Sequence, residues 1–216
     1  MKNSFYNADG KNIILKMVRG IQQNKDFLGE VDGLIGDGDH GMNMNKGFSV
    51  FEQRFGEDAF SFSEGLGNLS MILMNEIGGS MGPIYGTILM SMGDAIDDSE
   101  KEEIELGDFS AYFEAGLEGL YDIVDARVGD KTLVDTLAPA VSSLQKDAAE
   151  QVSFADALKH MKEAALAGRN STKDLIAKYG RSSRLGERSR GVLDAGSCSC
   201  YIILEAMADG ILELLS

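Results

Sequence analysis

Three aspartates close together form the densest chemical signal in the sequence. Residues 32–41 read Asp-Gly-Leu-Ile-Gly-Asp-Gly-Asp-His-Gly, so Asp32, Asp37 and Asp39 are separated and followed by glycines. Carboxylates this close repel one another unless a cation lies among them. Their oxygens suit Mg²⁺ or Ca²⁺, and Mg²⁺ completes its shell with water and substrate phosphates. The loop therefore predicts a divalent-metal site, with a flexible acidic surface turn as the alternative.

Three better-known glycine motifs do not account for this loop. Gly36, Gly38 and Gly41 match the dinucleotide pattern G-x-G-x-x-G, but that pattern requires a preceding strand, and the neighbourhood has a helical period. An EF-hand that begins at Asp37 would have Met42 and Phe48 where Gly and Glu are required. The chain also contains no P-loop sequence G-x-x-x-x-G-K-[ST]. These classes of nucleotide and calcium site are therefore excluded.

The residues that follow the aspartates favour a phosphate ligand. The sequence Gly41-Met42-Asn43 begins a predicted helix, and free N–H groups at a helix N-terminus bind phosphate oxygens. His40 lies beside two acids, which favours a role near bound phosphates over a role in capping or orienting a neighbour. His160 falls within another predicted helix and is interpreted as a surface residue.

Other segments could also contact an anion. Residues 78–83 read Gly-Gly-Ser-Met-Gly-Pro, which indicates either close backbone approach to a ligand or a tight turn between helices. Residues 169–190 contain seven Lys and Arg against two acids, in a chain whose net charge is −15. Arginine suits bidentate phosphate contacts, although the segment could instead face a partner. Residues 129–132 and 194–196 each precede a helix and could cap it or contact a ligand.

The rest of the chain supplies a helical scaffold for these loops. Apolar residues recur with the helical period, and only two prolines occur. The predicted helices cover residues 9–24, 41–55, 63–77, 84–96, 108–124, 132–146, 153–168 and 197–215. The last helix is apolar on several sides, which predicts a central buried position. Residues 32–45 and 178–196 break the helical period and are the expected places for function.

Length and composition narrow the class of protein. The 216 residues fit a single domain over residues 1–216, and 44% hydrophobic residues provide for one large core. No run of about 18 apolar residues is present, so we expect no membrane span. The acidic charge makes nucleic acid and anionic membranes poor partners. Cys198 and Cys200 are too few for a zinc site and suit buried, reduced thiols, which agrees with a cytoplasmic protein.

The chain resembles the L subunit of bacterial dihydroxyacetone kinase, the DhaL or DAK2 family. Four separated motifs carry the resemblance in order along the chain. They are Ile35-Gly36-Asp37-Gly38-Asp39-His40-Gly41 with Asn43; Gly78-Gly79 and Gly82-Pro83 with Gly86-Thr87; Gly129-Asp130-Lys131-Thr132; and Gly180-Arg181 with Leu185-Gly186-Glu187-Arg188-Ser189. The sequence departs from the family's usual residues at Ser80-Met81, Val192 and Ala195.

The resemblance implies an all-α fold, in which eight antiparallel helices form a closed barrel with the nucleotide in loops at one end. It implies two Mg²⁺ ions on Asp32, Asp37 and Asp39. It also implies that Arg181 and His40 act in catalysis. The implied contacts to ADP or ATP are His40, Gly41, Met42, Asn43, Gly79, Ser80, Met81, Leu133, Arg181, Asp194, Ala195 and Gly196.

The same resemblance implies a divided enzyme. A separate K subunit would bind dihydroxyacetone or another ketose, and this chain would present the γ-phosphate to it. ADP would be recharged by a phosphoprotein of the sugar phosphotransferase system, the M subunit, or replaced by free ATP. A homodimer is a further possibility. The alternatives are a regulatory module that binds nucleotide, and a kinase subunit for another ketose or acceptor.

Overall fold

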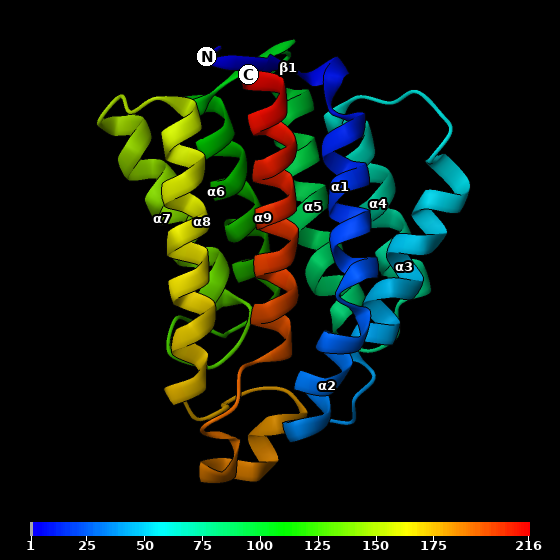
Figure 1. Ribbon diagram of the computed structural model, residues 1–216, viewed down its shortest axis with the longest axis vertical. Coiled ribbons are helices and arrows are strands. Elements are labelled where there is room, and N and C mark those ends of the chain that lie inside the picture. Colours follow the sequence, from blue (N-terminus) through cyan, green and yellow to red (C-terminus); the bar gives the residue numbers. More distant parts are fainter. Residues whose placement is uncertain (1) are drawn as a thin grey trace.

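The structure is a computed structural model that describes residues 2–216, and it is all-α apart from two short strands. Its long helices run along one axis and place both chain ends at the same end of the molecule (Figure 1). Over the described residues, the α-helices are α1 (Lys11–Gln23), α2 (Lys25–Ile35), α3 (His40–Phe55), α4 (Phe62–Glu76), α5 (Met81–Asp98), α6 (Leu106–Ile123), α7 (Val134–Ala149), α8 (Phe154–Ser171) and α9 (Ala195–Leu215).

The helices pack side by side in nearly the order of the chain. From α3 to α9, each helix contacts the next, and α1 contacts α3, α4 and α9. One hydrophobic core joins them all, from Phe5 near the start of the chain to Leu215 near its end. Helix α9 supplies more buried residues than any other element, because it is apolar around most of its circumference. Its predicted central position agrees with this burial.

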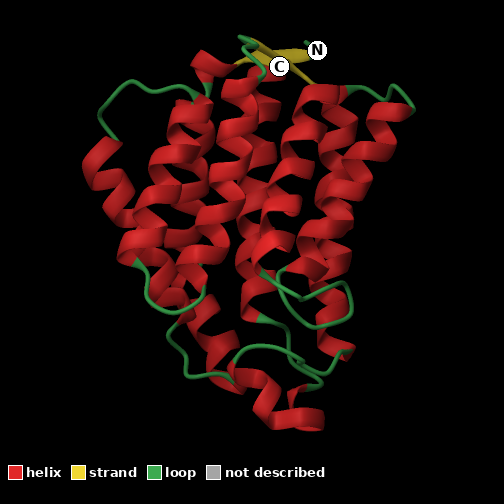
Figure 2. Cartoon of the chain, turned by 180° about the vertical axis from the view of Figure 1, so that it is seen from behind, coloured by secondary structure: helices red, strands yellow, loops and turns green. Residues whose placement is uncertain are grey.

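The end that carries the termini is closed by aromatic packing and a small sheet. Strands β1 (Ser4–Tyr6) and β2 (Glu103–Glu105) pair antiparallel, with Phe5 opposite Ile104 (Figure 2). The ring of Phe5 lies 5.8 Å from that of Phe62 and 6.2 Å from that of Phe154, measured between centroids. Phe109 completes the cluster, 5.5 Å from Phe154. We call this end of the bundle the far end, because the aspartate loop and the second glycine loop lie at the opposite end.

The structure places the eight predicted helices within a few residues of their expected limits and adds α2, which was not predicted. Helix α2 continues through Asp32 to Ile35, so the expected break over residues 32–45 is reduced to the four residues between α2 and α3. Asp32 therefore stands on the last turn of a helix. Three short 3₁₀ segments complete the chain: η1 (Asn7–Asp9), η2 (Thr172–Asp174) and η3 (Arg181–Ser189). Within residues 2–216, no helix combines the length and the apolar character that a membrane span needs.

Candidate functional site

A cavity of about 690 Å³ opens at the end of the bundle opposite the termini. Its wall is built from the turns that begin α3, α5, α7 and α9, together with the segment around residue 180. These turns are far apart in the sequence, and the ring of helices brings them to one end. Thus the acidic loop, the second glycine loop, the segment 131–134 and the segment 194–196 all face one space.

The three aspartates converge on one point of the cavity wall. One carboxylate oxygen from each of Asp32, Asp37 and Asp39 lies within 4.8 Å of the other two. Gly36 makes room for this arrangement, because a Cβ atom there would lie 2.3 Å from Oδ1 of Asp32. Gly38 turns the chain between Asp37 and Asp39 with a φ of +77°, a conformation that glycine adopts without strain. All-oxygen donors at this spacing fit a hard divalent cation such as Mg²⁺.

A positive group already lies among these carboxylates. The Arg181 guanidinium forms an ion pair with Asp37, and its Nη1 atom lies 3.6 Å from Oδ2 of Asp39. Arg181 reaches this position from η3, which is remote in the sequence. The guanidinium offsets part of the repulsion among the three carboxylates. It also shows that a phosphate beside the aspartates would be within reach of a guanidinium.

His40 is the first residue of α3, and its side chain is buried against the cavity. Its backbone N–H lies 3.4 Å from Oδ2 of Asp32, and its Nε2 atom lies 2.8 Å from the Ser199 hydroxyl. Burial lowers the pKa of His40 to about 4, although the Asp32 carboxylate acts in the opposite direction. The imidazole is therefore neutral at physiological pH. A neutral ring can help to orient a ligand but adds no positive charge for phosphate.

Two helices, α3 and α5, start at the cavity without a capping side chain on the preceding residue. The residues that precede them are Asp39 and Ser80, and neither side chain accepts a hydrogen bond from the first turn, although the His40 N–H lies 3.4 Å from Oδ2 of Asp32. In α7, by contrast, the Val134 N–H donates to the Thr132 hydroxyl at 3.2 Å. The other first-turn N–H groups of α3 and α5 lack an intrahelical partner. Such groups, with the positive end of the helix dipole, bind anions. The cavity thus brings three carboxylates and helix N-terminal N–H donors together on one wall.

The segment 129–132 is braced by buried polar contacts. The Asp135 carboxylate accepts hydrogen bonds from the backbone N–H groups of Gly129 and Thr132, at 2.6 and 2.8 Å. The buried Lys131 side chain donates to the carbonyl oxygens of Thr172, at 2.5 Å, and Val192. Burial lowers the pKa of Lys131. Lys131 therefore ties this cavity loop to the segment between α8 and α9.

Asp194 caps α9 and lies on the same wall. Its carboxylate accepts a hydrogen bond from the Ser197 N–H at 2.7 Å, as the sequence suggested for one of its two possible roles. Burial raises the pKa of Asp194 to about 7 despite this bond and the nearby Lys131. The carboxyl group therefore exchanges a proton near neutral pH.

Most of the expected site residues line the cavity, and two do not. The lining includes Asp32, Asp37, Asp39, His40, Asn43, Gly79, Ser80, Met81, Leu133, Arg181, Asp194, Ala195 and Gly196. Gly41 instead lies against α2, where a Cβ atom would be 1.9 Å from the Lys25 carbonyl oxygen. The Met42 side chain is exposed and lies outside the cavity lining. Gly41 allows α2 and α3 to approach closely, so it supports the site through packing.

Several residues near the cavity were not expected from the sequence, and two of them make polar contacts behind its wall. Tyr85 on α5 lines the cavity. The hydroxyl of Ser199 on α9 lies between the Tyr85 hydroxyl and Nε2 of His40 and contacts both. Tyr85 lies one helical turn after the start of α5, and nothing in the sequence around it indicated a role in the site. Ser199 is a polar residue on an otherwise apolar helix, which is a weak sign of a buried polar contact.

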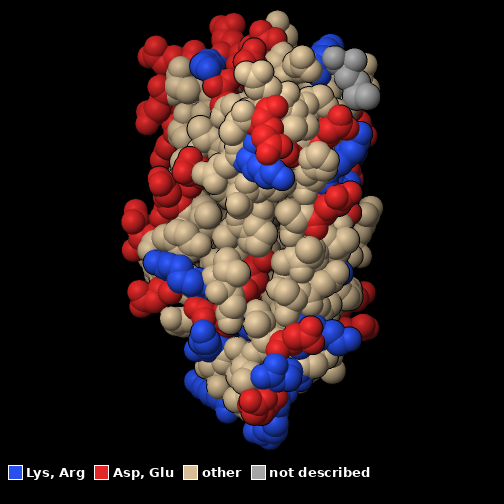
Figure 3. Space-filling view, turned by 90° about the vertical axis from the view of Figure 1, so that its left-hand side faces the viewer, with Lys and Arg blue, Asp and Glu red and all other residues tan. Residues whose placement is uncertain are grey.

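Basic side chains surround the same end of the molecule. Figure 3 shows Lys and Arg gathered at the lower tip, while Asp and Glu dominate the upper part of the surface. The exposed members of the segment 169–190 are Lys173, Lys178, Arg181, Arg184, Arg188 and Arg190. Lys178 forms an ion pair with Asp130, at 2.5 Å, and Arg190 pairs with Glu187, at 3.2 Å. Arg184 and Arg188 form no ion pair within residues 2–216. The tip therefore remains available to anionic groups.

Comparison with known proteins identifies the family. The model of the DAK2 domain matches residues 34–209, so this chain belongs to the DAK2 domain family. It is 37% identical over 188 residues to the ADP-binding subunit DhaL of a PEP-dependent dihydroxyacetone kinase of Listeria innocua, covering 87% of this chain and 88% of the relative. It is also 37% identical over 190 residues to the ADP-binding subunit DhaL of the PTS-dependent dihydroxyacetone kinase of Lactococcus lactis, covering 88% and 90%.

The fold matches a solved structure. The chain superposes on the dihydroxyacetone kinase of C. freundii with a TM-score of 0.72 and 20% identity. The match covers 94% of this chain but only 34% of the kinase chain, so the chain spans about a third of that enzyme. A second structure of that kinase, in complex with AMP-PNP and Mg²⁺, gives a TM-score of 0.68. At this identity the match establishes the shared fold alone.

Proposed function

We propose that this chain is the nucleotide-binding subunit of a dihydroxyacetone-type kinase and that ADP or ATP occupies the cavity. The observation that carries the proposal is the meeting of three aspartates with the uncapped N-termini of α3 and α5 on one cavity wall. Carboxylates alone would repel a polyphosphate, and N–H donors alone would not hold a metal ion. Together they fit a magnesium–nucleotide complex. The names of the relatives from Listeria and Lactococcus support the same ligand.

Asp32, Asp37 and Asp39 would hold the metal, which we propose to be two Mg²⁺ ions. Bound Mg²⁺ neutralises phosphate charge and aligns the transferred group. Arg181 would leave its pair with Asp37 and contact a phosphate, where a guanidinium forms two parallel hydrogen bonds. Gly79, Ser80 and Met81 begin α5 at the cavity and would offer backbone N–H groups.

The remaining contacts in the proposal come from the other turns. The backbone of residues 194–196 and the side chains of Asn43 and Leu133 would contact the base and the ribose. His40 would act beside the phosphates as a neutral residue. Within this cavity, the metal and phosphate groups position the γ-phosphate, so the chain itself needs no nucleophile.

The acceptor would be held by another protein. We propose a ketose-binding K subunit as partner, with the exposed arginines of the tip near the contact. The phosphoryl source would be exchanged ATP or a phosphoprotein of the sugar phosphotransferase system. We further propose that residues 1–216 form one domain in the cytoplasm, with the helices closed into a barrel through the contact of α9 with α1.

The proposal is tested by reconstitution. The purified chain is mixed with a ketose-binding K subunit, Mg²⁺ and ATP, and ketose phosphate is measured; a parallel reaction uses a phosphorylated transferase protein as donor. Product in either reaction is the expected result. If neither reaction gives product while the chain still binds ADP with Mg²⁺, a regulatory nucleotide-binding module becomes the better interpretation. If only ketoses other than dihydroxyacetone give product, the proposed acceptor, dihydroxyacetone, is wrong.

A further inference from the structure

A line of buried hydrogen bonds runs behind the cavity and joins three helices. The Nε2 atom of His40, at the start of α3, lies 2.8 Å from the hydroxyl of Ser199 on α9. That hydroxyl lies 2.6 Å from the hydroxyl of Tyr85 on α5. The Tyr85 hydroxyl also lies 2.9 Å from the carbonyl oxygen of Gly196, which belongs to the cavity wall. The line therefore connects the end of the aspartate loop with the start of α9.

The number of protons determines the direction of this line. Ser199 and Tyr85 each have one hydroxyl proton, and a carbonyl oxygen can only accept. All three contacts become hydrogen bonds if Nε2–H donates to Ser199, Ser199 to Tyr85, and Tyr85 to the Gly196 carbonyl. In the opposite direction, Ser199 would donate to Nε2 and Tyr85 to Ser199, and the Gly196 carbonyl would lose its contact with the tyrosine proton.

The other contacts of Ser199 agree with this direction. Its hydroxyl lies 3.2 Å from the Ala195 carbonyl oxygen and 3.1 Å from that of Gly196. Both oxygens only accept, so they also draw the serine proton away from His40. In each of these arrangements Nε2 of His40 is the donor and Ser199 is the acceptor.

The other ring nitrogen of His40, Nδ1, is not enclosed by the protein. Nδ1 has no hydrogen-bond partner within residues 2–216, yet no fully buried side-chain nitrogen or oxygen in that range lacks one. Nδ1 is therefore reached by solvent, and His40 lines the cavity. In the Nε2–H tautomer, Nδ1 carries a lone pair. A lone pair accepts a hydrogen bond from an O–H group but cannot donate to a phosphate oxygen.

We propose that Ser199 and Tyr85 are positioning residues that hold His40 in the Nε2–H tautomer and present the Nδ1 lone pair to an O–H donor of the bound ligand. The donor is a water molecule on the metal ion or a ribose hydroxyl. The identity of this ligand rests on the proposed function, whereas the tautomer does not. The proposal also makes the expected role of His40 near the phosphates specific, because the ring would accept a hydrogen bond from an O–H group.

The tautomer can be measured directly because the chain has only two histidines. The protein is labelled with ¹⁵N-histidine in a His160→Gln background, which leaves the signals of His40 alone. Long-range ¹H–¹⁵N spectra at neutral pH then show which nitrogen carries the proton. The expected result is a protonated Nε2 and an unprotonated Nδ1. A proton on Nδ1, or an equal mixture of the two tautomers, would overturn the proposal.

Two variants test the positioning role. Tyr85→Phe removes the hydroxyl that accepts from Ser199, and Ser199→Ala removes the acceptor of Nε2–H. Each is expected to produce a tautomer mixture and to weaken ADP binding with Mg²⁺ about tenfold, as the loss of one buried hydrogen bond implies. If Ser199→Ala fails to fold, Tyr85→Phe, which keeps the shape of the side chain, provides the measurement.

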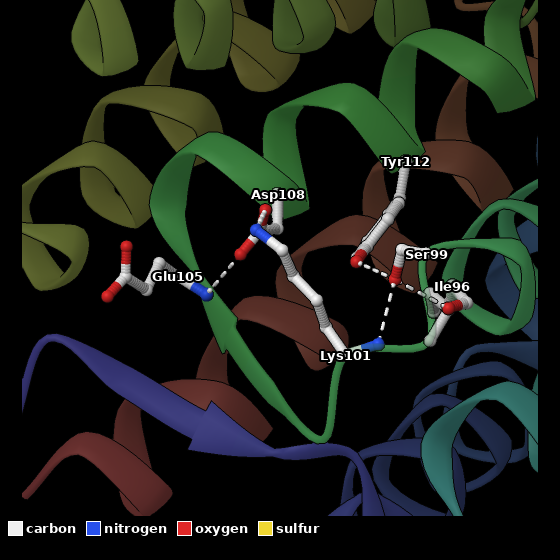
Figure 4. Close-up of polar contacts among 6 residues, drawn as sticks. All are labelled: Ile96, Ser99, Lys101, Glu105, Asp108 and Tyr112. Carbon is white, nitrogen blue, oxygen red and sulfur yellow. Dashed lines mark hydrogen bonds and ion pairs between the residues drawn. The ribbon is translucent and has the colours of Figure 1, made fainter.

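A matched control exists at the far end. Figure 4 shows a second tyrosine–serine pair, in which the Tyr112 hydroxyl lies 2.7 Å from Ser99 Oγ and Ser99 donates to the Ile96 carbonyl at 2.7 Å. This pair has no histidine and lies beside β2. Tyr112→Phe is therefore expected to leave the His40 tautomer and the ADP affinity unchanged. If Tyr112→Phe changed the His40 tautomer and the ADP affinity as much as Tyr85→Phe does, general loosening of the fold would explain both variants, and the proposal would be overturned.

The two proposals fail in different ways. If the wild-type chain binds no ADP with Mg²⁺, the proposed function fails, and the spectra still decide the tautomer. If Tyr85→Phe changes the tautomer while ADP affinity stays as in the wild type, the proposed function stands and the acceptor role of Nδ1 is refuted.

Discussion

The two ends of the helical bundle begin their helices in different ways. At the far end, the side chains of Ser61 and Glu64 form a capping box for α4, Glu105 and Asp108 do so for α6, and Ser153 caps α8. At the cavity end, Asp194 caps α9 and the Thr132 hydroxyl accepts from the first N–H of α7, whereas α3 and α5 begin without a capping side chain. Caps stabilise a helix by satisfying its first N–H groups. We expect the first-turn N–H groups of α3 and α5 to bind the ligand instead.

The turns differ in the same sense. At the cavity end, Gly38 and Gly79 take positive φ values of +77° and +72°. At the far end, the turns after α5 and α7 place Glu100 and Gln151 at positive φ, where a side chain adds strain. Lys131, in the cavity wall, also has a positive φ, of +61°, so the difference concerns the two glycine loops alone. The far end tolerates some strain because dense aromatic packing holds it. We expect one end to provide stability and the other to provide binding, and the predictions below test this separation.

The largest expected effect is a loss of stability from the far end alone. Phe109→Ala removes a fully buried ring from the cluster with Phe154 and should lower the free energy of unfolding by about 3–5 kcal/mol. Because the site is remote, the folded fraction should bind ADP with Mg²⁺ within about twofold of the wild type. Chemical denaturation and calorimetric titration measure the two quantities. A large loss of affinity in the folded protein would show that the ends are coupled.

A substitution at the cavity end should have the opposite effect, weakening ADP binding and leaving the stability of the fold unchanged. Asp37→Asn removes one of the three converging carboxylates and should weaken magnesium-dependent ADP binding at least about 100-fold, or about 2.7 kcal/mol. The free energy of unfolding should change by less than about 0.5 kcal/mol, since Asp37 is exposed and surface ion pairs contribute little. Asp58→Asn, at an exposed acid near the far end, is the control and should alter neither. Unchanged ADP binding in Asp37→Asn would refute the metal assignment.

The cavity end should also make stability depend on pH. Burial raises the pKa of Asp194 to about 7, above the usual value of about 3.9 in an unfolded chain. Between these values the folded protein binds more protons than the unfolded one, so stability falls as the pH rises from about 4 to about 7.

Asp194→Asn tests this prediction, because the amide oxygen can still cap Ser197 while the titration is lost. The variant should be more stable than the wild type above about pH 7, by on the order of 1 kcal/mol after screening by cavity solvent, with no difference below about pH 4. The measurement is chemical denaturation across this range without metal. Parallel pH curves for the two proteins would contradict the role of Asp194.

The far end and the helices were largely predictable from the sequence, because both depend on local signals. Apolar periodicity located eight helices, and Ser153 with Asp156 signalled the start of α8. Helix α2 was missed because it is short and because Gly29 and Gly33 interrupt its apolar pattern. The break assigned from Asp32 onwards therefore began too early.

The cavity was predictable only in part. The aspartate loop and the glycine segments carried local signals, and the family resemblance grouped them into one expected site. Tyr85 and Ser199 could not be placed, because their contact with His40 depends on how α3, α5 and α9 pack. Arg181 was expected in the site from the family resemblance, but its ion pair with Asp37 depends on the path of the segment between α8 and α9. Contacts made by tertiary packing leave no fixed spacing in a sequence.

The smallest expected effect tests the caps themselves with a matched pair of serines. Ser61 accepts from the Glu64 N–H at 3.2 Å before α4, whereas Ser80 precedes α5 without a cap hydrogen bond. Ser61→Ala should lower the free energy of unfolding by about 1 kcal/mol and leave ADP binding unchanged. Ser80→Ala should leave stability unchanged, because no hydrogen bond is lost. If both changes cost the same stability, the first turn of α5 is capped as α4 is, and its N–H groups are not reserved for phosphate.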